Sequence, residues 1–506
     1  MQKHIAIIDI GSRSVKLEIY ALKDGTHKLM FKASEPTFLG RNMQHGEISE
    51  VAMTATLDAL RTFKNHINNY DEVKIYAIAT AAMRIAKNAR TFSQEILRVL
   101  GDNAEFEIIP GEREAYYDYL GAVNTLSIRD FLLIDVGGAS TELALVKDRK
   151  LIKSVSLNFG SLSITERFFR DNVQAHNISE AEHSVKQELD KIDWLKDARG
   201  LPIVGLGSSI YAMGKYNLQR AMCRLGNVTL HNHKILHSTF NFIYKLISKT
   251  MPEVRRDKLG ISKGVADVVL GGLVPLKCVF DIINTRRVYI SLYGLRYGVL
   301  TEKFAHSIGL ISPIEPDVTS SSVLKLQAKT NCDIEHAENV EALALNLFDQ
   351  TSKLHYMGDR YRSLLSIAAK LHDCGAFVQY NNHHLHSFYL IKESEIFGLN
   401  ARDRLIVAII AGMHRKEKLK FNRWKYFCFI DRNTYKHIKS LGVMLGIAEE
   451  TSRIAGGARQ LKCNIQQTAI LIDIVKNNEK LIQPYQATGE HRKLNASLFG
   501  RNVLIK

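Results

Sequence analysis

The chain has 506 residues, of which 46% are hydrophobic and 24% charged, and its net charge is +16. Length alone allows three or four domains with ample core, and no uncharged apolar run approaches the length of a membrane span. The first residues enter a strand at once, without the pattern of a secretion signal, so we expect a cytoplasmic protein. The six cysteines are scattered, which argues against a zinc site or a disulfide framework. The positive charge suggests a polyanionic partner (nucleic acid, acidic lipid or polyphosphate), although a generally basic proteome would also explain it.

A strand–turn–strand pattern with an aspartate before the turn occurs twice, in 5–19 (IAIIDIGSRSVKLEI) and 131–146 (FLLIDVGGASTELALV), 126 residues apart. Backbone N–H groups and hydroxyls in such a turn can hold a phosphate, and the aspartate can reach it through a divalent ion or a water. One copy is more often a plain β-turn, but two copies a domain-length apart predict two related α/β domains facing a phosphate cleft. The candidate residues are Asp9, Gly11, Ser12, Arg13, Ser14, Asp135, Gly137, Gly138, Ala139 and Ser140.

After the first hairpin, the pattern predicts a strand at 28–33, an amphipathic helix at 50–67 and a buried strand at 73–78. That last strand delivers Arg84, which could grip a phosphate bidentately or serve as a surface ion-pair partner.

A strand at 105–109 is stopped by Pro110-Gly111, and a helix follows to about Val123. Its first turn holds Glu112 and Glu114, and acidic residues there are favoured by the helix dipole. Alternatively, one of these carboxylates acts as a general base on a water molecule. The spacing does not choose between these roles.

The second domain continues with a strand at 151–156 and a helix at 160–169. Ser179 and Glu182 form a predicted capping box for a helix that ends near Leu195. A strand at 201–204 runs into Gly207 and Ser208, where the start of the next helix is a third phosphate contact or a close-packing turn. A helix at 261–279, a strand at 288–292 and a helix at 294–304 complete the domain.

Residues 311–322 carry two prolines and several Ser/Thr residues, which predicts a linker. No proline then occurs before Pro484, and helical periodicity indicates a separate helical domain. It contains several histidines and the adjacent pair His372-Asp373, a combination that suits divalent metals. HD-type metal phosphohydrolases assemble sites in this way, but they need a late aspartate where 445–450 offers glutamates. We therefore favour a scaffold without a metal and keep a metal centre as the alternative. The histidines are His336, His372, His383, His384, His386 and His414.

The segment 414–425 (HRKEKLKFNRWK) is basic with interleaved aromatic residues, so it either follows a polyanion backbone or forms a solvated face. Its candidate polyanion contacts are Arg415, Lys416, Lys418 and Lys420. From about residue 467 the pattern becomes strand-like, which predicts a small α+β tail.

Together these motifs resemble the exopolyphosphatase/guanosine pentaphosphate phosphatase (Ppx/GppA) family across nearly the whole chain. The resemblance implies two RNase H-like domains of the actin, sugar-kinase and acetate-kinase superfamily at 1–125 and 126–308. An all-α HD-like domain at 309–460 and a small α+β segment at 461–506 would follow. The motifs are TAAMR (80–84), IIPGEREAYYDYLGA (108–122), DVGGASTEL (135–143), GLGSS (205–209), YGLRYGVL (293–300), HAENVEALALNLFDQ (336–350) and LHDCG (371–375).

The resemblance also implies the chemistry. Glu114 would be the catalytic base, Asp135 with Glu142 would hold Mg²⁺ or Mn²⁺, and Arg84 would neutralise the attacked phosphate. The substrate would be inorganic polyphosphate, with removal of the 5′-phosphate of pppGpp to give ppGpp as a related activity. The protein would be a homodimer, with polyphosphate rather than nucleic acid as its partner.

The sequence departs from the family pattern at Arg13, Arg113, Ala139 and Tyr297, which we expect to alter charge or shape near the cleft and so affect substrate preference. Two other classes of function stay open: a phosphotransferase of the same superfamily, and a non-catalytic sensor of polyphosphate or (p)ppGpp.

Overall fold

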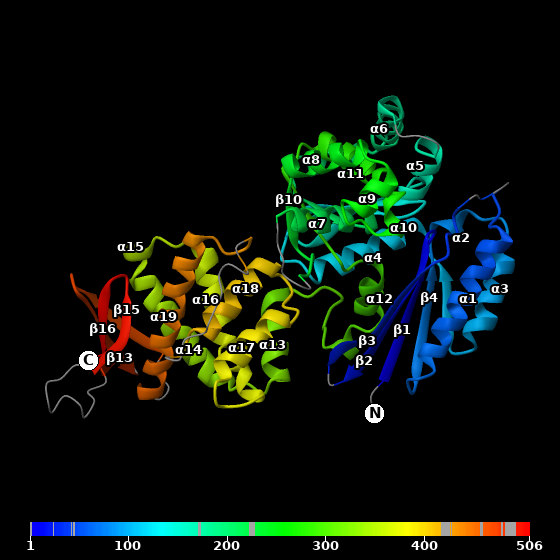
Figure 1. The fold of residues 1–506 in the computed structure, drawn as a ribbon. Helices are drawn as coiled ribbons and strands as arrows, with labels where there is room; N and C mark the ends of the chain where they lie inside the picture. The colour runs from blue at the N-terminus through cyan, green and yellow to red at the C-terminus, as the bar shows by residue number, and fades with distance from the viewer. Residues whose placement is uncertain are drawn as a thin grey trace. The chain divides into compact units, whose positions relative to one another are not determined.

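The structure is a computed structural model that describes residues 3–23, 25–41, 43, 46–170, 174–221, 228–415, 426, 428–455, 459–476, 479–480 and 492–505. The chain forms two compact units. The first, called here the α/β unit, comprises residues 1–221 and 229–316, and the second, called the helical unit, takes in the chain from residue 317 onward (Figure 1). Within the described residues, no helix has the length and apolar character needed to cross a bilayer.

The first lobe of the α/β unit is a five-stranded sheet in the order β3-β2-β1-β4-β5. β1, β2 and β3 are antiparallel, whereas β4 and β5 run parallel to β1. Buried residues of α1 and α3 join the sheet in one hydrophobic core. The elements are β1 (Lys3–Ile10), β2 (Ser14–Lys23), β3 (Thr26–Pro36), α1 (Glu50–Ile67), β4 (Val73–Ala79), α2 (Ala81–Ile85), α3 (Ala89–Leu100) and β5 (Ala104–Ile108).

The second lobe repeats this topology in a six-stranded sheet ordered β10-β11-β9-β6-β7-β8. β6, β7 and β8 are antiparallel, β9 and β11 continue the sheet in parallel, and β10 adds an antiparallel edge. This repetition confirms the predicted pair of RNase H-like lobes. The strands are β6 (Phe131–Val136), β7 (Thr141–Lys147), β8 (Lys150–Leu157), β9 (Ile203–Leu206), β10 (His233–Leu236) and β11 (Arg287–Ile290). The helices are α5 (Ser161–Phe168), α6 (Ala175–Leu189), α7 (Ser208–Arg220), α8 (His237–Ser248), α9 (Pro252–Asp257), α10 (Lys263–Ala266) and α11 (Val269–Ile283).

Two helices cross between the lobes. α4 (Gly111–Val123) leaves the first lobe and packs on β7 and β8 of the second, whereas α12 (Leu295–Lys303) leaves the second lobe and packs on β1 of the first. The two helices touch each other where only glycine fits, because a Cβ on Gly298 would lie 2.0 Å from the carbonyl oxygen of Tyr117. The two lobes are therefore joined by a closely packed helix crossing.

The helical unit packs its helices and a small sheet around one hydrophobic core, to which Leu461, Ile472 and Val503 of the sheet contribute. The sheet order is β12-β13-β16-β15, with β14 paired to β13. The helices are α13 (Val318–Lys329), α14 (Ile334–Gln350), α15 (Ser352–His355), α16 (Asp359–Leu371), α17 (His383–Glu393), α18 (Ala401–Gly412) and α19 (Arg432–Ala455). The strands are β12 (Gln460–Ile465), β13 (Ala469–Lys476), β14 (Glu479–Lys480), β15 (Arg492–Leu498) and β16 (Arg501–Ile505).

Several local predictions are wrong. The proposed capping box at Ser179 lies inside α6, which begins at Ala175 and ends at Leu189. The Ser/Thr run of the predicted linker is the start of α13, because the Asp317 carboxylate accepts hydrogen bonds from the Thr319 and Ser320 amides. The helix expected over 261–279 is two helices, α10 and α11, and β10 and α8 had no sequence prediction. Cys428 is disulfide-bonded, whereas Cys278, Cys332, Cys374 and Cys463 are free, so the described cysteines do not form a disulfide framework.

Candidate active site

The two predicted turns share one hydrogen-bond geometry and meet. The Gly11 amide donates to the Ser14 carbonyl at 3.1 Å, and the Gly137 amide donates to the Ser140 carbonyl at 3.0 Å. A Cβ on Gly138 would lie 3.2 Å from the Cβ of Ser12, so the turns face each other at van der Waals distance. The sequence repeat is therefore a structural repeat across the cleft.

A cavity of about 310 Å³ lies between these turns. It is lined by most of the predicted residues: Asp9, Gly11, Ser12, Arg13, Ser14, Glu114, Asp135, Gly137, Gly138, Ser140, Gly207 and Ser208. Three predicted residues, Arg84, Ala139 and Glu142, are not in its lining. Arg84 and Glu142 lie behind Glu114, with a guanidinium nitrogen of Arg84 3.9 Å from a Glu142 oxygen.

Glu114 sits in the first turn of α4, where Pro110 directs the chain from the end of β5 into the helix. Its Oε2 accepts a hydrogen bond from Arg84 Nη1 at 2.7 Å, and the same nitrogen donates to the Ile109 carbonyl. Burial raises the pKa of Glu114 to about 7, with Asp9 and Asp135 adding to the rise and Arg84 opposing it. A carboxylate with such a pKa can accept a proton near neutral pH. Glu112, the other candidate, is exposed.

Several other buried carboxyl groups lie close to Glu114. Burial, with the neighbouring acidic groups, raises the pKa of Asp118 and of Glu142 well above their usual range, and that of Asp135 to about 6. Asp118 Oδ1 accepts from the Leu295 amide at 2.8 Å, but its Oδ2 is buried with no hydrogen-bond partner among the described residues. A buried carboxylate oxygen without a donor is costly unless a proton or a cation satisfies it.

These oxygens fit a hard divalent cation. Asp118 and Asp135 both line the cavity and present carboxylate oxygens of the kind that Mg²⁺ prefers. Glu142, predicted as a ligand, accepts a hydrogen bond from Ser156 Oγ at 2.7 Å and its side chain is only 1% exposed. It therefore stands one layer behind the cavity wall.

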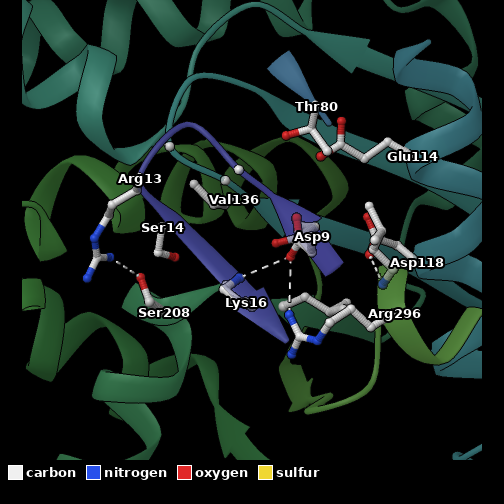
Figure 2. Close-up of a pocket in the computed structure, with 18 of the residues that line it drawn as sticks. Asp9, Arg13, Ser14, Lys16, Thr80, Glu114, Asp118, Val136, Ser208 and Arg296 are labelled. Carbon is white, nitrogen blue, oxygen red and sulfur yellow. Dashed lines mark hydrogen bonds and ion pairs between the residues drawn. The ribbon is translucent and has the colours of Figure 1, made fainter. Parts of the chain in front are cut away.

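Positive charge reaches the cavity from α12 and β2. Arg296 places Nη1 3.1 Å from Asp9 Oδ2 and Nη2 3.0 Å from Glu18, and Lys16 lies 3.5 Å from Asp9 (Figure 2). Burial lowers the pKa of Arg296, but the carboxylates of Glu18 and Asp9 more than offset this and raise it. Asp118, Arg296, Lys16 and Glu18 had no predicted role in the site. All four lie within quoted motifs, whose letters alone do not tell which side chains converge.

Arg13 connects the first turn to the second lobe, since its Nη1 donates to Ser208 Oγ at 2.6 Å (Figure 2). Ser208 opens α7 after Gly207, whose φ of 104° favours glycine. Of the other departures, Tyr297 lines the cavity. Arg113 is absent from the lining; it donates to Glu302 at 2.6 Å and lies over the Tyr117 ring, so its effect on the cleft stays a prediction.

In the helical unit, five of the noted residues converge with one of the late glutamates, Glu449: His336, His372, Asp373, His383 and His414. Of the predicted polyanion contacts, Arg415 lies over the Tyr380 ring at 5.6 Å. Lys416, Lys418 and Lys420 lie outside the described residues.

Comparison with known proteins agrees with this geometry. The sequence model of the Ppx/GppA phosphatase family matches residues 19–306, and that of Ppx/GppA phosphatase domain III matches residues 318–478. Among solved structures, the Aquifex aeolicus PPX-GPPA enzyme is 27% identical with a TM-score of 0.50, and the match covers 59% of this chain and 99% of that one. An exopolyphosphatase from Cytophaga hutchinsonii shares the fold at 21% identity and a TM-score of 0.54, covering 61% of this chain and 99% of that one. With more than half of its length matched, this chain belongs to the Ppx/GppA phosphatase family.

Proposed function

We propose that this chain is an exopolyphosphatase, which hydrolyses the terminal phosphoanhydride bond of inorganic polyphosphate and releases orthophosphate. The observation that carries the proposal is Glu114, a base with a pKa of about 7 at the wall of a cavity formed by two facing turns. Family membership and the relatives named for exopolyphosphatase and PPX-GPPA activity support the same class of substrate.

The terminal phosphate would sit between the two turns, held by backbone amides and by the hydroxyls of Ser12, Ser14 and Ser140. Glu114 takes a proton from a water molecule as that water attacks the terminal phosphorus. The bond from phosphorus to the bridging oxygen breaks, and the shortened polymer leaves with that oxygen. Positioning and charge neutralisation carry most of the acceleration in such transfers.

Asp118 and Asp135 would hold a Mg²⁺ ion at this cavity, with Glu142 behind them. When bound, the cation neutralises charge on the transferred phosphoryl group. Arg84 is placed to fix the orientation and ionisation of Glu114 rather than to contact the phosphate, since it lies outside the cavity lining.

Removal of the 5′-phosphate of pppGpp is the second candidate, because it breaks the same type of bond. The observation that favours it is a pair of aromatic side chains in the cavity wall, Tyr293 and Tyr297, whose ring centroids lie 5.1 Å apart. A base of the nucleotide could contact such a ring.

The test measures orthophosphate release from long-chain polyphosphate and from pppGpp with Mg²⁺, side by side. Faster turnover of polyphosphate supports the proposal, and faster turnover of pppGpp supports the second candidate. Transfer of phosphate from ATP to acetate or a sugar would instead show a kinase. Tight polyphosphate binding without phosphate release would show a sensor.

A further inference from the structure

Six side chains of types that can bind a metal, in or next to five helices of the helical unit, meet at one place. His336 is in the first turn of α14, His372 and Asp373 follow the end of α16, and His383 opens α17. His414 follows α18, and Glu449 lies on α19. All six belong to the helical unit, whereas the residues assigned above to polyphosphate hydrolysis belong to the α/β unit.

Three of the histidines have a fixed tautomer. His372, His383 and His414 each place Nδ1 within 2.6–2.9 Å of the carbonyl oxygen three residues earlier in the chain. A carbonyl only accepts, so each Nδ1 carries a proton, and in the neutral imidazole each Nε2 then has a lone pair available to a metal. Metal-binding histidines are oriented in this way by backbone carbonyls.

These lone pairs face one another and two carboxylates. His383 Nε2 lies 3.0 Å from His414 Nε2, a repulsive arrangement for two acceptors unless a cation or a proton lies between them. Asp373 Oδ1 lies 2.8 Å from His383, 3.4 Å from His372 and 3.6 Å from His414. Glu449 Oε2 lies 2.9 Å from His336 and 3.2 Å from His372.

This spacing matches the coordination sphere of a metal. Two ligand atoms bound at ~2.0–2.2 Å to one ion stand about 2.8–3.6 Å apart in tetrahedral or octahedral geometry. Imidazole with carboxylate suits first-row transition metals better than Mg²⁺. Moreover, Arg453 Nε lies 2.6 Å from Glu449 Oε1, which leaves Oε2 directed at the histidines.

The side chains form two groups that share Asp373: one with His336, His372 and Glu449, the other with His383 and His414. The geometry points to a centre for two divalent first-row transition-metal ions in the helical unit, bridged by the Asp373 carboxylate. This differs from the scaffold without a metal that the sequence favoured, because Glu449 stands in place of the missing late aspartate.

The centre is closed on one side and open on the other. The side chains of His372 and His414 are 0% exposed, whereas those of His336 and Asp373 are 25% and 29% exposed. Ions can therefore enter from solvent past Asp373.

The experiment loads the full-length chain with Co²⁺ in excess Mg²⁺, removes unbound ions and measures cobalt per chain together with visible absorption. Mg²⁺ occupies sites made only of oxygen, so cobalt reports sites with imidazole ligands. We expect two Co²⁺ per chain and a ligand-field band from nitrogen ligands. Asp373→Asn, which keeps the shape of the side chain, should lose at least one ion. His386→Ala, on the same helix as His383 but outside the cluster, should keep both.

One or no Co²⁺ per chain in the wild type, or two in Asp373→Asn, would overturn the inference. Glu449→Gln provides a second test if Asp373→Asn does not fold, since it should also reduce the cobalt content. An Asp118→Asn/Asp135→Asn variant should still bind two Co²⁺ ions. Cobalt content thus tests the metal centre independently of whether the α/β unit hydrolyses polyphosphate.

Discussion

The guanidinium of Arg84 donates a hydrogen bond to the Glu114 carboxylate at 2.7 Å, in a setting where burial raises the pKa of that carboxyl. The pair combines two opposing effects, because burial favours the protonated acid and Arg84 favours the ionised base. The balance leaves Glu114 able to exchange a proton near neutral pH.

Replacing Glu114 with Gln should reduce phosphate release at least ~100-fold, because general-base help is worth that much or more. The variant should fold, since glutamine preserves the size of the side chain. Steady-state phosphate release and circular dichroism check both statements. Glu112→Gln is the matched control in the same helical turn; it is exposed and should retain wild-type turnover. Near-normal turnover in Glu114→Gln would remove Glu114 from the mechanism.

The pH dependence should carry the signature of this pair. Glu114 acts as a base only when ionised, so kcat/KM should fall as the pH decreases through about 7. Arg84→Met removes the cation that lowers the pKa and leaves burial, Asp9 and Asp135, which raise it. The midpoint of the acidic limb should therefore move to higher pH, as measured at saturating Mg²⁺. Arg90→Met, at an exposed site nearby, should leave the midpoint in place. An unchanged or lower midpoint in Arg84→Met would contradict this account of the pair.

Arg296 should matter for stability. Arg296→Met leaves Asp9 and Glu18 buried without their main cation, and breaking a buried ion pair on one side costs about 3 kcal/mol. We expect a lower melting temperature of the α/β unit, measured by differential scanning calorimetry. The exposed Arg287→Met should melt like the wild type. Adding Glu18→Gln to Arg296→Met should recover part of the loss, and no recovery would show that the loss comes from packing instead.

A fragment of residues 1–316 should fold and hydrolyse short polyphosphate, because it contains the complete cavity and both cores of the α/β unit. Residues 309–316 belong with it: Asn124 Nδ2 donates to the Pro313 carbonyl at 2.6 Å and Arg149 Nη2 donates to the Glu315 carbonyl at 2.6 Å. A fragment ending at 308, the boundary predicted from the sequence, should therefore melt at a lower temperature than 1–316. Equal melting temperatures would show that these contacts contribute little, and an inactive but folded 1–316 would place part of the chemistry in the helical unit.

The sequence predicted what depends on local pattern. The two hairpins were found because an apolar strand, an aspartate and a glycine turn recur, and α1 was found because its apolar spacing is regular. Two helix starts were predicted wrongly. Ser179, predicted to cap a helix, lies inside α6, and Asp317 caps α13 within a run that was predicted to be a linker. Short polar side chains favour caps and loops alike, so their presence alone does not decide.

The site was less predictable where side chains come from distant parts of the chain. Asp118 and Arg296 enter the cavity from α4 and α12, which cross between the lobes. Glu449 joins His336 across 113 residues. Such convergence depends on helix packing, which no short motif records. The local pattern placed Glu112 and Glu114 together in the first turn of a helix, and only the family resemblance selected Glu114, which lines the cavity.

The crossing of α4 and α12 also determines where the chain can be cut. Each lobe is covered by a helix whose sequence follows the strands of the other lobe: α12 packs on β1, and α4 packs on β7 and β8. A fragment ending at residue 125 would contain α4 without the strands it covers, and it would expose to solvent the surface of β1 on which α12 packs. Although the two halves repeat one topology, we expect neither to fold when expressed alone, because each depends on a helix from the other half.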